Sequence, residues 1–169
     1  MALREELLTV AGEPTFDQLT NSLPYLDAVV HETLRVHSPV TEQIRVVSSL
    51  QFYLYFPLTG INCQATEDDI IPLSEPVRTR SGDLVDNIFI AKGTRIGISI
   101  SCMNCSTLIW GPDAKEFRPE RWLEKDGLPK KAQEIHGYRH LLTFSDGPRA
   151  CLGTGFVLAE LKVSFLVAE

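Results

Sequence analysis

The chain has 169 residues and a mass of 18.9 kDa, which is the length of one domain or of part of one. Hydrophobic residues make up 44% of it and charged residues 22%, proportions typical of a folded globular protein. The net charge of −6 opposes attraction to phosphate backbones and argues against nucleic acid as a partner. No apolar run approaches the about 18 residues of a membrane span, and acidic residues occupy the start of the chain. We therefore expect neither an anchor nor a signal peptide in this chain.

Two helices are predicted in the first forty residues. Residues 1–10 place their apolar side chains close to one face of a helix. The second helix is predicted within residues 22–39, with Ser22 as the expected N-cap and Pro24 in the first turn, and its apolar residues recur with the helical period. Pro39 ends this helix, because the residue before a proline avoids the helical conformation.

The hydrophobic pattern changes from helical to alternating further along the chain. Residues 84–101 contain two alternating runs separated by Lys92-Gly93, which predicts a β-hairpin with a turn at that dipeptide. Residues 112–139 are polar, with scattered proline and glycine, and predict a long ordered loop with short helical turns. Residues 155–169 are apolar on almost every side, as in a helix that is buried all round.

One segment directly before the last predicted helix combines phenylalanine, glycine, arginine and cysteine at fixed spacings. It reads F-S-D-G-P-R-A-C-L-G, and its informative positions are Phe144, Gly147, Arg149, Cys151 and Gly153. A cysteine before a helix meets backbone N–H groups and the positive end of the helix dipole, which favour the thiolate that binds metals. The two glycines permit the tight bend that this requires. The alternative is an inert cysteine buried as a small hydrophobic residue.

This segment resembles the haem-binding loop of cytochrome P-450 monooxygenases, F-x-x-G-x-R-x-C-x-G, at every specified position. The resemblance implies that Cys151 is the axial thiolate ligand of the iron in haem b, iron protoporphyrin IX. It also implies that Arg149 binds one haem propionate and, more weakly, that Arg45 meets the second. For Arg45 the alternative is a solvated charge at a strand edge. The expected cofactor-binding residues are therefore Phe144, Gly147, Arg149, Cys151, Gly153 and Arg45.

Two further signatures of the family occur in the expected order along the chain. Glu32 and Arg35 form E-T-L-R, which matches the family's E-x-x-R helix, and Arg121 lies in a P-E-R segment. Positions three apart share one helix face, where a single carboxylate can bridge two guanidinium groups. The alternative for E-x-x-R alone is a solvated surface pair. Because the three motifs occur together, we predict a buried structural triad of Glu32, Arg35 and Arg121 that fixes the long loop beneath the haem.

The resemblance extends over nearly the whole chain, is of the fungal type, and covers only the C-terminal part of the family fold. It implies a mainly α fold with a small β-hairpin region: the C-terminal, proximal, haem-ligand portion of the cytochrome P-450 fold, incomplete. We expect residues 1–169 to form a single partial domain of this kind.

The resemblance also implies a function and its partners. It predicts a haem-thiolate monooxygenase that inserts one atom of dioxygen into a small apolar organic substrate. Electrons would come from NADPH through a cytochrome P-450 reductase, and the family's expected location is the cytosolic face of the endoplasmic reticulum membrane. The alternative function is a truncated, non-catalytic remnant or gene-model fragment that binds haem weakly or not at all.

Residues 47–64 interrupt the resemblance. The flanking sequences would join as RVATEDDIIPLSEPV, and the interrupting segment is apolar and uncharged. Val47-Ser48 can be encoded by GTAAGT, a splice-donor sequence, and Gln64 by CAG, an acceptor, so one hypothesis is a retained in-frame intron. The alternative is a genuine apolar loop or strand, because QFYLYF has strong strand propensity.

The remaining candidate ligands are cysteines and histidines outside these motifs. Cys102 and Cys105 form a C-x-x-C, which alone is weak support for a zinc or thioredoxin site because a second ligand pair and a βαβ context are both missing. We interpret this spacing as chance. The four histidines show no ligand spacing and are expected on helix surfaces or in loops; they are His31, His37, His136 and His140.

Overall fold

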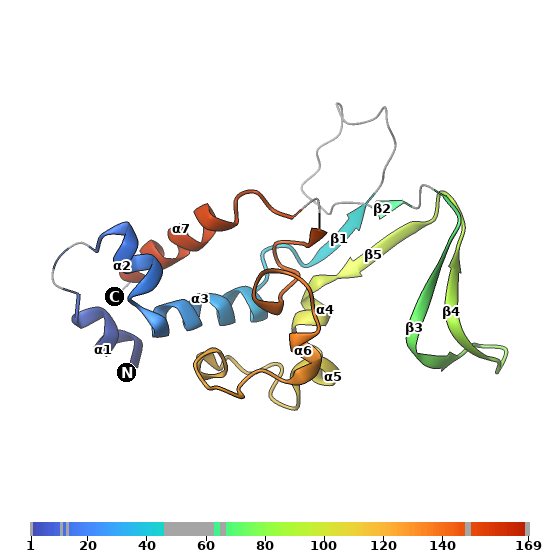
Figure 1. Cartoon of the computed structure of the whole chain (residues 1–169), viewed down its shortest axis with the longest axis horizontal. Coiled ribbons are helices and arrows are strands. Elements are labelled where there is room, and N and C mark those ends of the chain that lie inside the picture. The colour runs from blue at the N-terminus through green and yellow to red at the C-terminus, as the bar shows by residue number, and fades with distance from the viewer. Residues whose placement is uncertain are drawn as a thin grey trace, which may run out of the picture. The chain divides into compact units, whose positions relative to one another are not determined.

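The computed structural model forms two compact units, one mainly helical and one made of strands (Figure 1). The helical unit consists of Met1–Thr41 and Ile100–Glu169, and the strand unit of Glu42–Ser99. Within them the structure describes residues 2–10, 12, 14–45, 63–64, 67–147 and 150–167.

Three helices begin the helical unit: α1 (Ala2–Leu8), α2 (Phe16–Asn21) and α3 (Pro24–Val36). The predicted first and second helices are confirmed as α1 and α3, whereas α2 was missed. Its start carries a capping box: Thr15 Oγ1 accepts the Gln18 N–H at 3.3 Å, and Gln18 Oε1 accepts the Thr15 N–H at 2.9 Å. The T-x-x-Q spacing in the sequence is the signal that could have revealed this short helix.

The predicted N-cap of α3 was wrong. Ser22 occupies the C-cap position of α2 instead, and Leu23, in the N-cap position of α3, makes no side-chain cap. A residue from another helix takes that role. The two carboxylate oxygens of Glu6, on α1, accept the backbone N–H groups of Tyr25 and Leu26, each at 2.8 Å. The unsatisfied N–H groups at the start of α3 are therefore bound by α1.

Short helical segments follow in the second part of the helical unit, before one long helix. The predicted ordered loop with short helical turns over residues 112–139 is confirmed, since one 3-10 turn and one short α-helix lie within it. The segments are α4 (Ile100–Asn104), α5 (Thr107–Trp110), η1 (Pro119–Trp122), α6 (Lys130–Gln133), η2 (Tyr138–His140) and α7 (Thr154–Val167).

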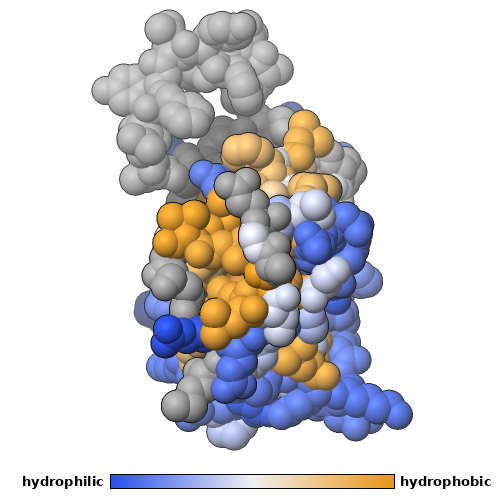
Figure 2. Space-filling view, turned by 90° about the vertical axis from the view of Figure 1, so that its left-hand side faces the viewer, coloured by the Kyte–Doolittle hydropathy of each residue, from blue (hydrophilic) through white to orange (hydrophobic). Residues whose placement is uncertain are grey.

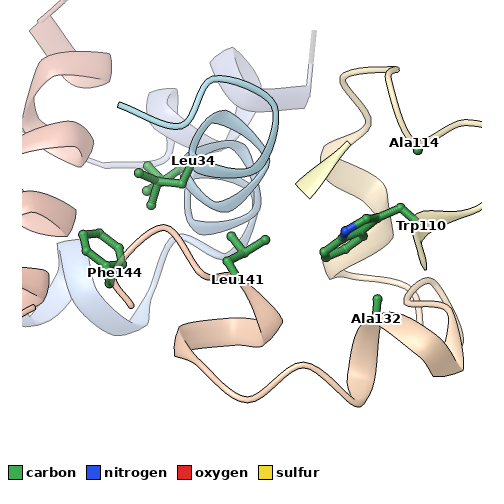
Figure 3. Packing of buried hydrophobic residues seen from close by; sticks show 7 residues of the cluster. Leu34, Trp110, Ala114, Ala132, Leu141 and Phe144 are labelled. Atoms are coloured by element: carbon green, nitrogen blue, oxygen red, sulfur yellow. The ribbon is translucent and has the colours of Figure 1, made fainter. Parts of the chain in front are cut away.

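The core of this unit lies between α3 and the segments that follow α4. Leu34 from α3 faces Leu141 and Phe144 of the later loop, and Trp110 from α5 lies near Ala132 of α6 (Figure 3). All five are at most 6% exposed. Burial on this scale draws the long loop onto α3 and so places that loop beside the charged residues of the helix.

The prediction that the last helix is buried all round was wrong. Among the described residues of α7, only Lys162 is buried. Phe156 and Val167 are 73% and 82% exposed. One side of the helix packs on α2 and α3, which leaves other apolar residues uncovered. Figure 2 shows apolar residues gathered on the face that carries α1, α2 and the end of α7. None of the helices in the described part of the chain has the length and apolar character needed to cross a membrane.

Two antiparallel sheets make up the strand unit. One has the order β1-β5-β2, and the other is a hairpin of β3 with β4. The strands are β1 (Glu42–Arg45), β2 (Cys63–Gln64), β3 (Asp69–Arg78), β4 (Leu84–Ile90) and β5 (Arg95–Ser99).

The predicted hairpin over residues 84–101 paired the wrong strands. The turn at Lys92-Gly93 is present, but β4 and β5 diverge from it into different sheets. β4 pairs instead with β3, which was missed because its two prolines argue against a strand. The pairing shifts register between Pro72 and Val77, an irregularity that accommodates the prolines.

Candidate functional site

The carboxylate of Glu32 lies at the centre of a buried group of charges. Glu32 and Arg35, one turn apart on α3, are both 0% exposed. Arg35 donates from Nη2 to Glu32 Oε1 at 2.7 Å and from Nε to Oε2 at 2.9 Å. Arg121, on η1, donates from Nε to Oε1 at 3.0 Å. The structure therefore brings the three residues of the expected triad together.

Two more donors, which were not predicted, complete the surroundings of Glu32. The backbone N–H of Arg118 donates to Oε1 at 2.9 Å, and the indole Nε1 of Trp122 donates to Oε2 at 2.9 Å. A buried carboxylate needs such donors to offset its lost hydration. The motif P-E-R-W contains this tryptophan, but nothing in the sequence indicates that its N–H meets Glu32.

The guanidinium of Arg35 also binds the chain that follows α4. Its Nη1 donates to the carbonyl oxygens of Asn104 and Ala114, and its Nη2 donates to that of Glu116 at 2.9 Å. Its Cζ lies 5.1 Å from the centroid of the Trp110 ring, within the range of a cation–π interaction. One arginine thus ties α3 to three backbone positions far along the chain.

The surroundings of Glu32 determine its charge. Burial raises the pKa of its carboxyl, but hydrogen bonds from Arg35, the Arg118 backbone and Trp122, with the charge of Arg35, hold the pKa below its usual value. Glu32 is therefore ionised at neutral pH and stays ionised under mildly acidic conditions. The network continues through Arg121, whose Nη2 lies 3.3 Å from Asp113 Oδ2.

The prediction for His31, which placed it on a helix surface, was wrong. His31 is 1% exposed, and the rings of Trp122 and Tyr138 lie 5.3 and 5.5 Å from it. Its Nδ1 is 3.3 Å from Asp27 Oδ2, and Asp27 Oδ1 is 2.7 Å from Lys162 Nζ of α7. Burial lowers the pKa of His31 although Asp27 opposes the shift. The imidazole therefore packs as a neutral aromatic ring.

Cys151 lies three residues before the first turn of α7, and its side chain is exposed. Its backbone N–H donates to the carbonyl oxygen of Phe144 at 2.8 Å, and its own carbonyl accepts the Thr154 hydroxyl at 2.8 Å. Gly147 has a φ of +73°, a backbone conformation that favours glycine. A Cβ on Gly153 would lie 3.8 Å from the cysteine sulfur. Hydrogen bonds thus fix the backbone of Cys151, while its thiol remains exposed to solvent.

Two expected site residues cannot be placed beside Cys151. Arg149 and the side chain of Arg45 lie outside the part of the chain that the structure describes. The backbone of Arg45 forms the end of β1, opposite Ile96 of β5. The interrupting segment 47–64 is likewise outside the description, except for the short strand Cys63–Gln64.

The two cysteines of the C-x-x-C motif lie within α4 and directly after it. Cys102 is exposed on α4 and Cys105 is half-buried after it. Among the residues that the structure describes, no three His, Cys, Asp or Glu side chains come together as a metal site.

Comparison with known proteins identifies the family of this chain. The family model for cytochrome P450 matches residues 1–51 and 68–167, which is most of the chain. The chain belongs to the cytochrome P450 family.

Fungal relatives agree with this assignment. The chain is 55% identical over 162 residues to cytochrome P450 monooxygenase claO of Ampulloclitocybe clavipes, an alignment covering 95% of this chain and 26% of the relative. It is 53% identical over 167 residues to claP of the same fungus, covering 98% and 28%. It is 43% identical over 162 residues to cytochrome P450 monooxygenase 128 of Postia placenta, covering 95% and 26%. The chain thus spans about a quarter of the length of these relatives.

Proposed function

We propose that this chain is the C-terminal, haem-ligand portion of a cytochrome P450 monooxygenase and that Cys151 is the axial ligand of its iron. The observation that carries the proposal is the geometry at Cys151: an exposed thiol before a long helix, on a backbone held by the Phe144 carbonyl at 2.8 Å. Family membership and the F-x-x-G-x-R-x-C-x-G spacing support it.

The described residues around Cys151 fit a haem. A single exposed cysteine would suffice to hold the haem iron, because the porphyrin would supply its own nitrogen ligands and no chelating side-chain cluster would be required. Leu152 and Phe156, which follow the cysteine in the sequence, are 104% and 73% exposed. An apolar macrocycle would cover such side chains favourably. When bound, haem supplies the oxygen-activating redox chemistry by which one atom of dioxygen enters an organic substrate.

The chain's own residues divide the supporting roles. Cys151 would hold the iron, Gly147 and Gly153 would allow the bend around it, and Phe144 would fix that bend by its carbonyl and its buried ring. Arg149 and Arg45 are proposed to bind the haem propionates as charge-assisted partners. The Glu32 triad would hold the long loop on α3 beneath the cofactor.

The wider function follows from the family and belongs to the whole protein. We propose a small apolar substrate, haem b as the cofactor, and electrons from NADPH through a cytochrome P450 reductase, at the cytosolic face of the endoplasmic reticulum membrane. The relatives are named monooxygenases, which supports this reaction class for the protein that contains this chain.

We further propose that residues 47–64 are an insertion relative to the family. The family match leaves residues 52–67 unmatched between two matched stretches, which supports this proposal. Genomic DNA distinguishes the two origins. The splice-site codons GTAAGT at Val47-Ser48 and CAG at Gln64 support a retained intron, whereas other codons at these positions support a translated apolar loop or strand.

The test of the haem ligand uses the natural full-length protein supplied with hemin. We expect its reduced carbonyl complex to give the red-shifted Soret band of thiolate ligation, and Cys151→Ala to abolish the band. Cys102→Ala, which removes another exposed thiol, is the matched control and should retain it. A full-length protein that binds no hemin contradicts the proposal and favours the non-catalytic remnant. A Cys151→Ala variant with the band intact contradicts the assignment of Cys151 as the ligand.

A further inference from the structure

Two buried polar side chains connect the charged group around Arg35 to the segment that holds Cys151. They are Asn104, the last residue of α4, and Thr143, in the loop before Cys151. Asn104 is 0% exposed and Thr143 is 6% exposed. Neither residue belongs to the motifs that identify the family in this sequence.

Thr143 binds the segment that leads to Cys151, residues 143–151 and here called the cysteine segment, to the C-terminal end of α3. Its hydroxyl donates to the carbonyl oxygen of Leu34 at 3.0 Å. Leu34 lies in the last turn of α3, where carbonyl groups lack a partner within the helix, so the hydroxyl satisfies a group that burial would otherwise leave unpaired. The next residue, Phe144, accepts the backbone N–H of Cys151 at 2.8 Å. One peptide unit therefore separates the anchor on α3 from the group that holds the cysteine backbone.

Asn104 also binds the hydroxyl of Thr143. Its Nδ2 donates to Thr143 Oγ1 at 3.1 Å, while its backbone oxygen accepts Arg35 Nη1 at 2.7 Å. A hydroxyl has one proton, and here it is donated to Leu34, so the asparagine must present its NH₂ group and not its oxygen. This fixes the direction of each hydrogen bond from Asn104 to Leu34.

Packing alone does not explain an asparagine at position 104, because one of its polar atoms is buried at a cost in free energy. Its Oδ1 is buried without a hydrogen-bond partner among the described residues. A leucine, which has the same branched shape, would bury no unpaired oxygen, so the gain from the asparagine lies in the bond that its NH₂ group makes to Thr143.

We infer that Thr143 and Asn104 are positioning residues that hold the backbone of Cys151 in a fixed position relative to α3. Their consequence for the iron rests on the proposed function, but the placement itself does not. Because Asn104 also binds Arg35, the position of the cysteine backbone is linked to the charged group around Glu32.

The first test is hydrogen exchange of the Cys151 amide, which needs no haem and is carried out on the natural full-length protein. We expect Thr143→Val to accelerate exchange at this amide about tenfold relative to the amides of α3, since one net hydrogen bond corresponds to a factor of this order. Thr143→Ser, which keeps the hydroxyl, should restore the wild-type rate.

Thr33→Val is the matched control. The Thr33 hydroxyl also donates to a backbone carbonyl within α3, that of Val29 at 2.8 Å, and makes no hydrogen bond to the described residues of the segment before Cys151. It should leave the Cys151 amide unchanged. Equal acceleration by Thr33→Val and Thr143→Val would show a general loss of stability and overturn the inference.

Asn104→Leu separates positioning from stability. It removes both the bond to Thr143 and the unpaired Oδ1, so thermal stability should change little while exchange at Cys151 accelerates severalfold. Wild-type exchange in both Asn104→Leu and Thr143→Val contradicts the inference.

The second test uses the haem-loaded protein. In Thr143→Val, a measurable share of the reduced carbonyl complex should lose the red-shifted Soret band of thiolate ligation and absorb at the shorter wavelength of thiol ligation. Thr143→Ser should restore the red-shifted band. An unchanged band together with faster exchange overturns the link to the iron. If the wild-type protein itself lacks the band, the proposed haem function fails, while the exchange rates still decide whether Thr143 and Asn104 place Cys151.

Discussion

The indole N–H of Trp122 donates to the carboxylate of Glu32, with 2.9 Å between Nε1 and Oε2. This bond joins the buried charges to a cluster of aromatic rings, because the Trp122 ring also lies 5.3 Å from that of His31 and 5.9 Å from that of Trp110, tilted against both. The tryptophan therefore serves the electrostatics of the triad and the packing of the core at once.

Trp122→Phe tests this bond while it keeps an aromatic ring in place. We expect the variant to lose about 1.5–3 kcal/mol of unfolding free energy, the usual range for a hydrogen bond to a charged group. Urea denaturation measures the loss. A loss well below this range would mean that the bond from Trp122 to Glu32 contributes little to stability.

Glu32→Ala tests the triad more severely. It leaves Arg35 and Arg121 buried without their carboxylate, and stranding a buried charge costs roughly 3–5 kcal/mol. We expect the full-length protein carrying this change to lose haem uptake, measured as haem bound per chain. Glu120→Ala removes a carboxylate from an exposed position on η1 and should keep haem content near wild type. Wild-type haem content in Glu32→Ala would contradict the structural role of the triad.

The sequence was informative where a side chain's chemistry depends on local spacing. Glu32 and Arg35 are three residues apart on one helix, and the distance follows from helix geometry alone. The partners Trp122, Asn104 and Thr143 come from segments far apart in the chain, and tertiary packing sets their contacts. No periodicity encodes such contacts, so they could not be predicted from one sequence.

Strand pairing could not be predicted from the sequence for the same reason. Alternation identified the runs that became β4 and β5, and the turn between them, but not their partners. Pairing depends on which neighbour offers a matching edge, and the prolines of β3 concealed that edge. His31 was misplaced for a related reason: a polar residue on a helix reveals its burial only when the rings that cover it are known.

The buried His31 predicts a pH dependence of stability. In the unfolded chain a histidine binds a proton near pH 6.5, whereas burial lowers the pKa of His31 in the folded chain. Between these two pKa values the unfolded chain binds more protons, so stability falls as the pH is lowered from about 6.5. Urea denaturation at a series of pH values should show this decline.

His31→Phe should flatten the decline, because a phenylalanine ring can fill the space between Trp122 and Tyr138 without titrating. His136→Phe, at an exposed position, should keep it. A decline of the same size in His31→Phe would assign the pH dependence to other groups.

The last prediction concerns the start of α3, the helix that carries both Glu32 and Arg35. Glu6 binds two backbone N–H groups there, and its negative charge also lies at the positive end of the helix dipole. Glu6→Ala should therefore cost about 1–2 kcal/mol of unfolding free energy, as for loss of a helix cap. Glu6→Gln should cost less, since its amide oxygen can accept one of the two bonds. Glu5→Ala, an exposed change in the same helix, controls for helix propensity, and a loss as large as that of Glu6→Ala would rule out the capping role.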